Sequence, residues 1–293
     1  MLRTRLWMGT VLVALAVGML FVDQQLAPWY PFLFLLLAGL ALAACFELLH
    51  LLGPASGLHG WFCYTAVAAL VVANWPAHLP VPGWPSAASA WPWVVGTLAA
   101  VLLGAFLVEM ATFREPGGSV TRIALTVWVA GYLGLLPSFF AQLRWLAGPG
   151  ADGPAYGTMA LALAIFVPKC GDIGAYTTGR LLGRHKMTPV LSPKKTWEGA
   201  AGGLVAAVGT AIGIDRLGPA LVLHGDLLAE VGFGLTVGVA GMLGDLAESL
   251  IKRDCEKKDA SNAVPGIGGI LDVIDSVLFA APVAYWWLAS SGG

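Results

Sequence analysis

Charged side chains are scarce in this sequence: Asp, Glu, Lys and Arg make up only 11% of its 293 residues, whereas hydrophobic residues make up 58%. A soluble domain carries about a quarter charged residues and about half apolar ones. The deficit of charge excludes an ordinary soluble globule, a disordered chain and a nucleic-acid-binding protein. We therefore expect a polytopic integral membrane protein whose water-facing loops are too short to form a separate domain.

Cysteine is also rare, because the chain has four of them and none forms a CxxC pair. We expect neither a disulfide nor a zinc site. A cleavable leader is not expected either, although Arg3 and Arg5 precede an apolar run from Leu6 to Val22. That run has no small-x-small cleavage site and is long enough to span a bilayer, so we interpret it as an uncleaved first span.

Long apolar runs are abundant, and a transmembrane helix needs about 20 mostly apolar residues. The runs predict an all-α protein with about nine transmembrane helices, the third of them short. The predicted spans are 5–22, 30–52, 60–75, 92–113, 120–143, 156–178, 197–214, 227–250 and 270–289. We divide the chain into an N-terminal transmembrane region, 1–155, and a C-terminal catalytic region, 156–293, with cytoplasmic loops at 179–195 and 252–269.

The loops predict the orientation through their Lys and Arg residues, which favour the cytoplasmic side. With the N-terminus in the cytoplasm, thirteen of the 16 basic residues face the cytoplasm. Arg144 and Arg216 face the other side, and Lys169 lies inside a span. This segregation predicts a cytoplasmic N-terminus, and it places the two basic loops on the cytoplasmic side of the cell membrane.

Acidic residues accompany these basic loops at the predicted ends of the spans. Asp245, Glu248 and Lys252 share one face of one helix, and Asp272 and Asp275 lie one turn apart on the next. An isolated ionisable residue in a span can be an interhelical polar contact, but a group of acids beside basic loops favours function. Adjacent carboxylates are stabilised by a cation, and oxygen ligands together with substrate phosphates suit Mg²⁺. This pattern indicates phosphoryl or nucleotidyl transfer.

Two short segments strengthen this interpretation. Gly266, Gly268 and Gly269 come just before the helix that carries Asp272, and backbone N–H groups at such a place can bind a phosphate. A glycine loop of this kind is by itself more often a simple turn. The segment 192–199, SPKKTWEG, predicts another helix start, or else a basic anchor at the membrane surface.

Several motifs together resemble those of the phosphatidate cytidylyltransferases (CDP-diacylglycerol synthases), over about residues 165–280. They are SLIKR (249–253), KD (258–259), PGIGGILDVIDS (265–276), DIGAYTTGR (172–180), SPKKTWEG (192–199) and GDLAES (244–249). The N-terminal half matches that family only as generic spans. The family usually has His where Ile267 stands and Arg where Val273 stands, so two potential contacts are missing here.

The resemblance implies transfer of CMP from CTP to phosphatidate, which yields CDP-diacylglycerol and pyrophosphate in phospholipid biosynthesis. It implies catalytic roles for Asp245, Asp272, Asp275 and Lys252, the three aspartates being ligands of Mg²⁺. It implies substrate contacts for Asp172, Tyr176, Arg180, Ser192, Lys194, Lys195, Ser249, Arg253, Lys258, Gly266, Gly268 and Gly269. CTP, phosphatidate and membrane lipids are the implied partners, nucleic acid is not, and the family resemblance suggests a homodimer.

Some alternatives remain open at this point. A polyprenol kinase or an archaeal-type lipid cytidylyltransferase would also combine basic loops with metal-binding carboxylates. A transporter would place acids along an ion path, but it would more often show inverted repeats, and none is visible here. An inactive homologue would explain Ile267 and Val273. A second metal or a monovalent ion beside Mg²⁺ also stays open.

Overall fold

The computed structural model describes residues 18–80, 89–148, 153–218, 220, 222–257 and 269–291. Nearly all regular structure in these ranges is helical, which confirms the all-α prediction. Helices suit so apolar a chain, because a backbone in lipid must satisfy its hydrogen bonds internally. The α-helices of the described residues are α2 (Pro31–Leu52), α3 (Gly60–Val72), α4 (Trp91–Thr112), α5 (Ser119–Ala130), α6 (Leu136–Gln142), α7 (Gly153–Leu182), α8 (Trp197–Leu217), α9 (Leu227–Asp254) and α10 (Ile270–Ser291). 3₁₀ turns lie at Pro54–Ser56, Pro76–His78 and Leu143–Trp145, and a π-helical turn at Gly131–Leu135 joins α5 to α6.

Seven helical stretches among the described residues are long and apolar enough to cross a membrane. They are α2, α4, α7, α8, α9, α10 and the continuous stretch Ser119–Trp145. These coincide with seven of the nine predicted spans, as expected for an integral membrane protein. The predicted third span is α3, which has 13 residues and is therefore about 20 Å long. That is too short for a hydrocarbon core of about 30 Å. Most of the predicted first span, 5–22, lies outside the described residues.

The segment predicted as a loop at 179–195 contains more structure than expected. Helix α7 continues to Leu182, and an antiparallel hairpin follows, formed by β1 (Lys186–Thr188) and β2 (Ser192–Thr196). In the second predicted loop, 252–269, α9 continues through Asp254, so Lys252 and Arg253 are helical. Residues 258–268 of that loop lie outside the described residues.

The chain divides into two compact units according to its internal contacts. One unit is residues 26–142, and the other joins the described residues up to Gln25 to those from Leu143 onward. In the first unit, α2 to α6 pack around buried residues such as Leu70 and Val94. The second unit contains α7 to α10 and the hairpin, and it carries every described residue of the predicted site.

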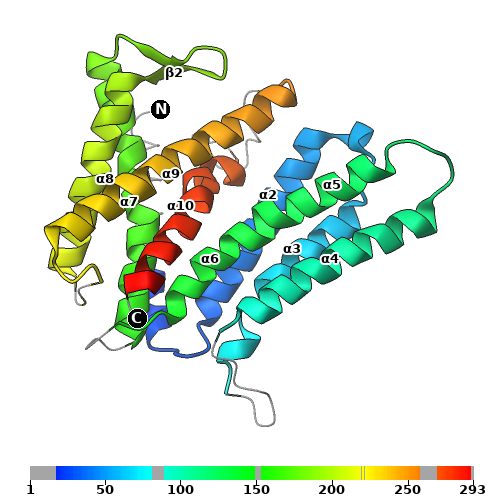
Figure 1. Cartoon of the computed structure of the whole chain (residues 1–293), viewed down its shortest axis with the longest axis horizontal. Coiled ribbons are helices and arrows are strands. Elements are labelled where there is room, and N and C mark those ends of the chain that lie inside the picture. The colour runs from blue at the N-terminus through cyan, green and yellow to red at the C-terminus, as the bar shows by residue number, and fades with distance from the viewer. Residues whose placement is uncertain are drawn as a thin grey trace. The chain divides into compact units, whose positions relative to one another are not determined.

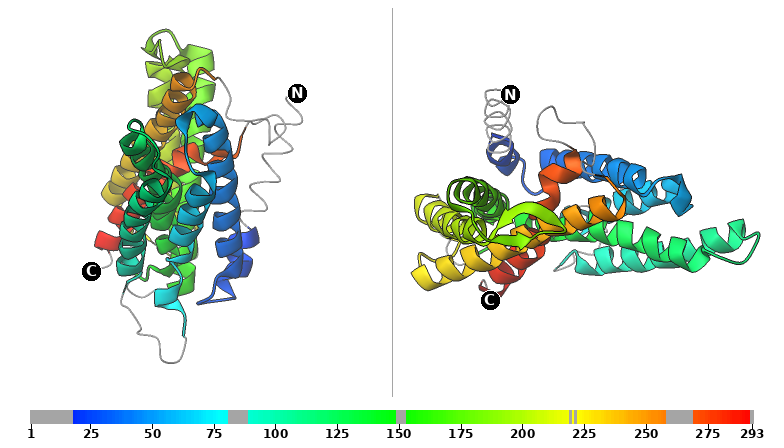
Figure 2. Two further views of the ribbon diagram at one scale, coloured as in Figure 1. Left: turned by 90° about the vertical axis from the view of Figure 1, so that its right-hand side faces the viewer. Right: turned by 90° about the horizontal axis from the view of Figure 1, so that it is seen from above.

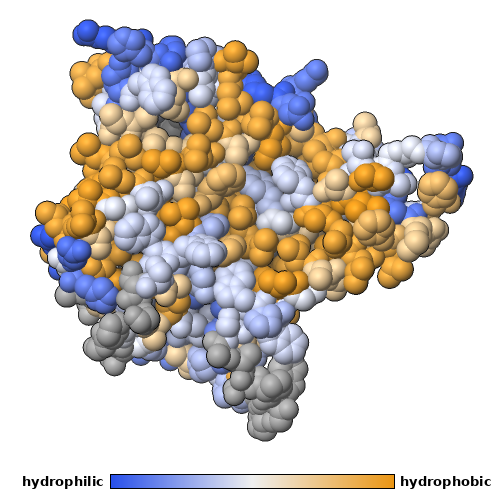
Figure 3. Space-filling model, viewed as in Figure 1, coloured by the Kyte–Doolittle hydropathy of each residue, from blue (hydrophilic) through white to orange (hydrophobic). Residues whose placement is uncertain are grey.

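Helices α7 to α10 pack side by side, with the hairpin at the end where α7 leads into α8 (Figures 1 and 2). Hydrophobic side chains cover much of the visible surface of α8 and α9, and hydrophilic side chains gather at the hairpin (Figure 3). Val205 on α8 and Leu243 on α9, for example, are exposed. Exposed apolar residues along helices of this length fit contact with lipid.

Candidate active site

Three carboxylates from two helices meet inside the second unit. Asp245 and Glu248 come from α9 and Asp275 comes from α10, and one ligand oxygen of each lies within 4.8 Å of the others. Glu248 and Asp275 are buried, whereas Asp245 is half-buried. Glu248 Oε1 is buried and has no hydrogen-bond partner among the described residues. Three hard oxygen donors with one orphaned buried oxygen fit a Mg²⁺ ion, so the residues present suit the predicted metal.

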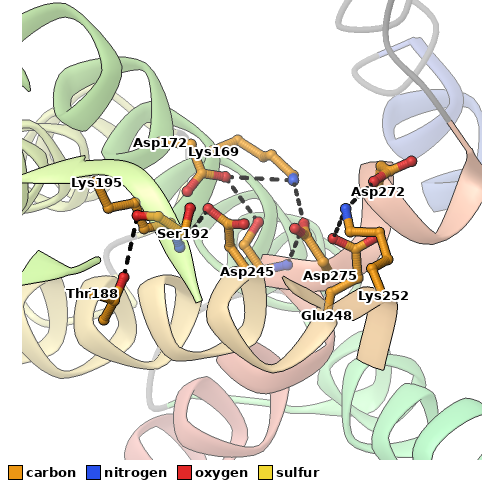
Figure 4. Close-up of polar contacts among 11 residues, drawn as sticks. Lys169, Asp172, Thr188, Ser192, Lys195, Asp245, Glu248, Lys252, Asp272 and Asp275 are labelled. Atoms are coloured by element: carbon orange, nitrogen blue, oxygen red, sulfur yellow. Dashed lines mark hydrogen bonds and ion pairs between the residues drawn. The ribbon is translucent and has the colours of Figure 1, made fainter. Parts of the chain in front are cut away.

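Asp272, which we predicted as a metal ligand, points to different partners. Its Oδ1 lies 2.6 Å from Lys252 Nζ, and its Oδ2 accepts a hydrogen bond of 2.6 Å from the backbone N–H of Gly269. Gly269 therefore donates to a side chain at the start of α10. Asp272 lies beside the three clustered carboxylates (Figure 4), and its role as a ligand stays a prediction.

Each carboxylate of the site lies near a lysine (Figure 4), although the Oε1 atom of Glu248 has no hydrogen-bond partner among the described residues. Lys195 Nζ lies 2.8 Å from Asp245 Oδ2, and Lys252 Nζ lies 2.6 Å from Glu248 Oε2. Lys169 Nζ lies 3.2 Å from Asp275 Oδ1 and 3.5 Å from Asp172 Oδ2. The described part of the site therefore alternates carboxylates and ammonium groups.

Close packing of the helices brings these side chains together. A Cβ atom at Gly241 of α9 would lie 2.7 Å from Cβ of Pro168 on α7. A Cβ atom at Gly244 would overlap the backbone carbonyl of Asp275 on α10. Only glycine permits such approaches without displacing a helix. The two glycines therefore bring α9 close enough to α7 and α10 for carboxylates on separate helices to meet.

The hairpin is attached to the start of α8 by Glu198. Its carboxylate accepts hydrogen bonds from the backbone N–H groups of Arg184 and His185, at 3.1 and 3.2 Å. His185 Nδ1 also lies 2.6 Å from Glu198 Oε1. Thr196 caps α8, because its hydroxyl accepts from the N–H of Gly199 at 3.1 Å. These contacts fix the end of β2, from which Lys195 reaches Asp245.

The structure gathers only some of the predicted site residues. Six of them take part in the ion pairs just described: Asp172, Lys195, Asp245, Lys252, Asp272 and Asp275. Tyr176 and Arg180 are exposed on α7 and pair with each other, with the Tyr176 hydroxyl 3.2 Å from Arg180 Nη1. The other described members are Ser192 and the exposed Lys194 on β2, Ser249 and the exposed Arg253 on α9, and Gly269. Lys258, Gly266 and Gly268 lie outside the described residues.

Three members of the cluster were not assigned a role from the sequence. Glu248 was recognised on the same helical face as Asp245, and its i+3 spacing was the signal that it belongs to the cluster. Lys169 was recognised as a charge inside a span, which is itself an indication of function. Ser276 donates its hydroxyl to Asp172 Oδ2 at 3.0 Å, and its only signal was its place at the end of the motif 265–276.

The arrangement suits chemistry on phosphate groups. The carboxylates could hold a divalent cation, and Lys195 and Lys252 could offset phosphate charge; a partly dry setting strengthens both kinds of interaction. No Ser–His or Cys–His pair of the kind that covalent catalysis uses is present at this cluster in the described residues.

Comparison with known proteins points to the same chemistry. The model of the cytidylyltransferase family matches residues 3–291. A phosphatidate cytidylyltransferase of Pseudomonas aeruginosa is 35% identical over 296 residues, which cover 100% of this chain and 99% of that protein. One from Bacillus subtilis is 39% identical over 178 residues, which cover 61% of this chain and 60% of that protein.

Plant relatives match over a shorter part of their own length. The chloroplastic phosphatidate cytidylyltransferase 5 of Arabidopsis thaliana is 34% identical over 206 residues, or 64% of this chain. The chain spans about half of that protein, because the match covers 50% of it.

Proposed function

This chain belongs to the cytidylyltransferase family, and from this premise we propose that it is a phosphatidate cytidylyltransferase. It would transfer CMP from CTP to phosphatidate and release pyrophosphate. The observation that carries the proposal is the meeting of Asp245, Glu248 and Asp275 with three lysines between membrane-type helices. The full-length similarity to a relative of that name supports the choice of substrates.

The reaction needs little acid–base chemistry from the protein. A phosphate oxygen of phosphatidate forms a bond to the α-phosphorus of CTP, and the bond from that phosphorus to the bridging oxygen of the β-phosphate breaks. Pyrophosphate leaves with that oxygen and its electron pair. The attacking oxygen is already ionised near neutral pH, so positioning and charge stabilisation are the main tasks. This agrees with a site made of carboxylates and lysines.

Asp245, Glu248 and Asp275 are the residues that would hold Mg²⁺, and Asp272 stays a candidate ligand. The bound cation would stabilise the negative charge of the triphosphate as the α-phosphorus is attacked. Glu248 Oε1 suits this role because it is buried and lacks a hydrogen-bond partner among the described residues. Asp272 orients Lys252 and the N–H of Gly269 through its two oxygens.

The basic residues fall into two groups, those that contact the carboxylates and those that are exposed. Lys195 and Lys252 reach the carboxylates and would contact phosphates of CTP close to the cation. Lys194 and Arg253 are exposed beside them and would bind the outer phosphates or the lipid phosphate. Ser192, Ser249 and the Tyr176–Arg180 pair would contact the nucleotide or the lipid headgroup. Phosphatidate would keep its acyl chains in the bilayer, so that only its headgroup enters the site.

The hairpin and the acid cluster would face the cytoplasm, where CTP is available. The distribution of Lys and Arg in the sequence supports this orientation and the cell membrane as the location. A homodimer remains a proposal based on the family resemblance.

The test is an assay of purified full-length protein in lipid nanodiscs with CTP, phosphatidate and Mg²⁺. One sample carries label in the cytidine and another in the γ-phosphate. We expect cytidine label in the lipid and γ-label in pyrophosphate, with both lost in Asp245→Asn and retained in the control Asp254→Asn, at an exposed helix end. Transfer of γ-label to a lipid would indicate a kinase, and no product from folded protein would refute the proposal.

A further inference from the structure

Lys169 lies in the middle of the site. It belongs to helix α7 and to neither of the two basic loops. It follows Pro168 in α7 and precedes Asp172 by one turn. Its Nζ contacts Asp275 Oδ1 at 3.2 Å and Asp172 Oδ2 at 3.5 Å (Figure 4). The ammonium group therefore bridges a carboxylate of α7 and a carboxylate of α10.

Asp275 takes part in two arrangements at once. It belongs to the carboxylate triad with Asp245 and Glu248, and it is also the partner of Lys169. Asp172 completes the second arrangement, held by Lys169 and by the hydroxyl of Ser276. Carboxylates this close repel one another unless a cation lies between them. On the side of Asp275 that faces α7, that cation is the ammonium group of Lys169.

The charge of the described site is consistent with a single further cation. It contains five carboxylates, from Asp172, Asp245, Glu248, Asp272 and Asp275. It contains three ammonium groups, from Lys169, Lys195 and Lys252. Two formal negative charges remain when all eight groups are ionised. One divalent cation balances them, and loss of Lys169 would leave an additional negative charge.

We propose that Lys169 serves as a tethered second cation of this site. The enzyme would then bind one divalent ion at Asp245, Glu248 and Asp275 and would require no second metal and no monovalent ion. This inference rests on the proposed function, because it concerns the same metal site. Lys169 is a positioning residue here: it holds Asp275 and Asp172 in place, whereas Lys194 and Lys195 of β2 would contact the substrate phosphates.

The test counts cations directly and does not depend on turnover. Full-length protein in nanodiscs is freed of metal with a chelator and titrated with Mn²⁺, and unbound Mn²⁺ is measured by electron paramagnetic resonance. The titration is done in tetramethylammonium chloride and again in KCl at the same ionic strength. Tetramethylammonium is too large to lie between two carboxylates, so the comparison isolates a site for a small monovalent cation.

We expect the unaltered protein to bind one Mn²⁺ with the same affinity in both salts. Lys169→Met should either bind a second Mn²⁺ or show a Mn²⁺ affinity that differs about tenfold or more between the salts, since one uncompensated charge acts over a few ångströms. Lys169→Arg retains the charge and should bind one Mn²⁺. Lys186→Met removes an exposed lysine from the first strand of the hairpin and should match the unaltered protein.

Three results would overturn the inference. In the first, the unaltered protein binds Mn²⁺ more tightly in KCl than in tetramethylammonium chloride, or it binds two Mn²⁺ ions. In the second, Lys169→Met binds one Mn²⁺ with the same affinity in both salts. If its apparent affinity for CTP also falls, Lys169 is a phosphate ligand. In the third, unaltered folded protein binds no Mn²⁺ with or without CTP, which refutes the proposed function as well. If Lys169→Met does not fold, Lys169→Gln, which keeps a polar group, is measured in its place.

Discussion

Gly244 of α9 lies directly against the backbone carbonyl of Asp275 on α10, so that a Cβ atom at position 244 would overlap that oxygen. The next residue along α9 is Asp245, whose carboxylate meets that of Asp275. The distance between these two carboxylates is therefore controlled by how closely the helix backbones approach, and a single hydrogen atom in place of a methyl group permits that approach.

The first prediction follows from this contact. Gly244→Ala should separate α9 from α10, lower the stability by about 1–3 kcal/mol through overpacking and reduce Mn²⁺ binding. Gly209→Ala is the matched control, because Gly209 is an exposed glycine of α8 whose added methyl group would meet nothing within 4 Å. That change should be neutral or slightly stabilising, since Ala favours helix over Gly. Thermal unfolding and Mn²⁺ titration measure both effects, and equal behaviour of the two variants would contradict the prediction.

The second prediction distinguishes Glu248 from Asp272 as a metal ligand. Glu248→Gln removes the charge of the triad member that has an orphaned oxygen, so Mn²⁺ affinity should fall about tenfold or more. Asp272→Asn should impair activity while changing Mn²⁺ affinity less, because Asp272 is engaged by Lys252 and Gly269. Mn²⁺ titration of the two purified variants compares their losses of affinity and so identifies the ligand. A greater loss of affinity in Asp272→Asn would restore the assignment made from the sequence.

The third prediction concerns the attachment of the hairpin. Glu198→Gln weakens the contacts to His185 and to two backbone N–H groups. We expect the KM for CTP to rise severalfold with little change in kcat, because Lys195 would be held less firmly while the carboxylates stay in place. Limited proteolysis should also cleave the hairpin faster. Glu115→Gln, in an exposed segment of the other unit, is the control. A fall in kcat at constant KM would assign Glu198 to the chemical step.

The fourth prediction tests the orientation in the membrane. Val190, at the tip of the hairpin, is 94% exposed, so Val190→Cys should react with a maleimide that enters the cytoplasm and not with one confined to the outside of intact cells. Leu228→Cys, at the start of α9 and 80% exposed, should show the opposite pattern. Labelling of position 190 from outside would reverse the predicted orientation.

The native Cys255 provides an internal control for that experiment. Burial and the neighbouring Asp254 raise the pKa of its thiol above the usual value. At a given pH, a smaller fraction of the Cys255 side chain is therefore thiolate than in an exposed cysteine, and the thiolate is the reactive form. Cys255 should therefore react more slowly than an exposed thiol near neutral pH, and its rate should keep rising at a pH where the exposed thiol has levelled off. A rate profile against pH measures this difference.

The seven long spans were predictable from the sequence, and so was the grouping of charged side chains on one helical face, because both depend on local patterns. A run of about 20 apolar residues needs no partner to be recognised, and Asp245, Glu248 and Lys252 share a helical face by spacing alone. The short α3 was placed correctly but counted as a span, since its apolar run extends beyond the helix into the turns that follow Val72. The hairpin was missed because its five-residue strand SPKKT has no alternating apolar pattern.

Which carboxylates meet was decided only by the tertiary structure. The sequence indicates Asp272 as a metal ligand and leaves Glu248 without a role. In the structure Lys252 contacts both carboxylates, but the second oxygen of Asp272 accepts from the N–H of Gly269, whereas the second oxygen of Glu248 is buried without a hydrogen-bond partner among the described residues. Lys169 stands 106 residues before Asp275, and no spacing rule connects them. Their contact exists because Gly241 and Gly244 let α7, α9 and α10 approach within van der Waals distance. Composition and helical period determine which side chains each helix presents, whereas the backbone separation between helices determines which of them share a cation.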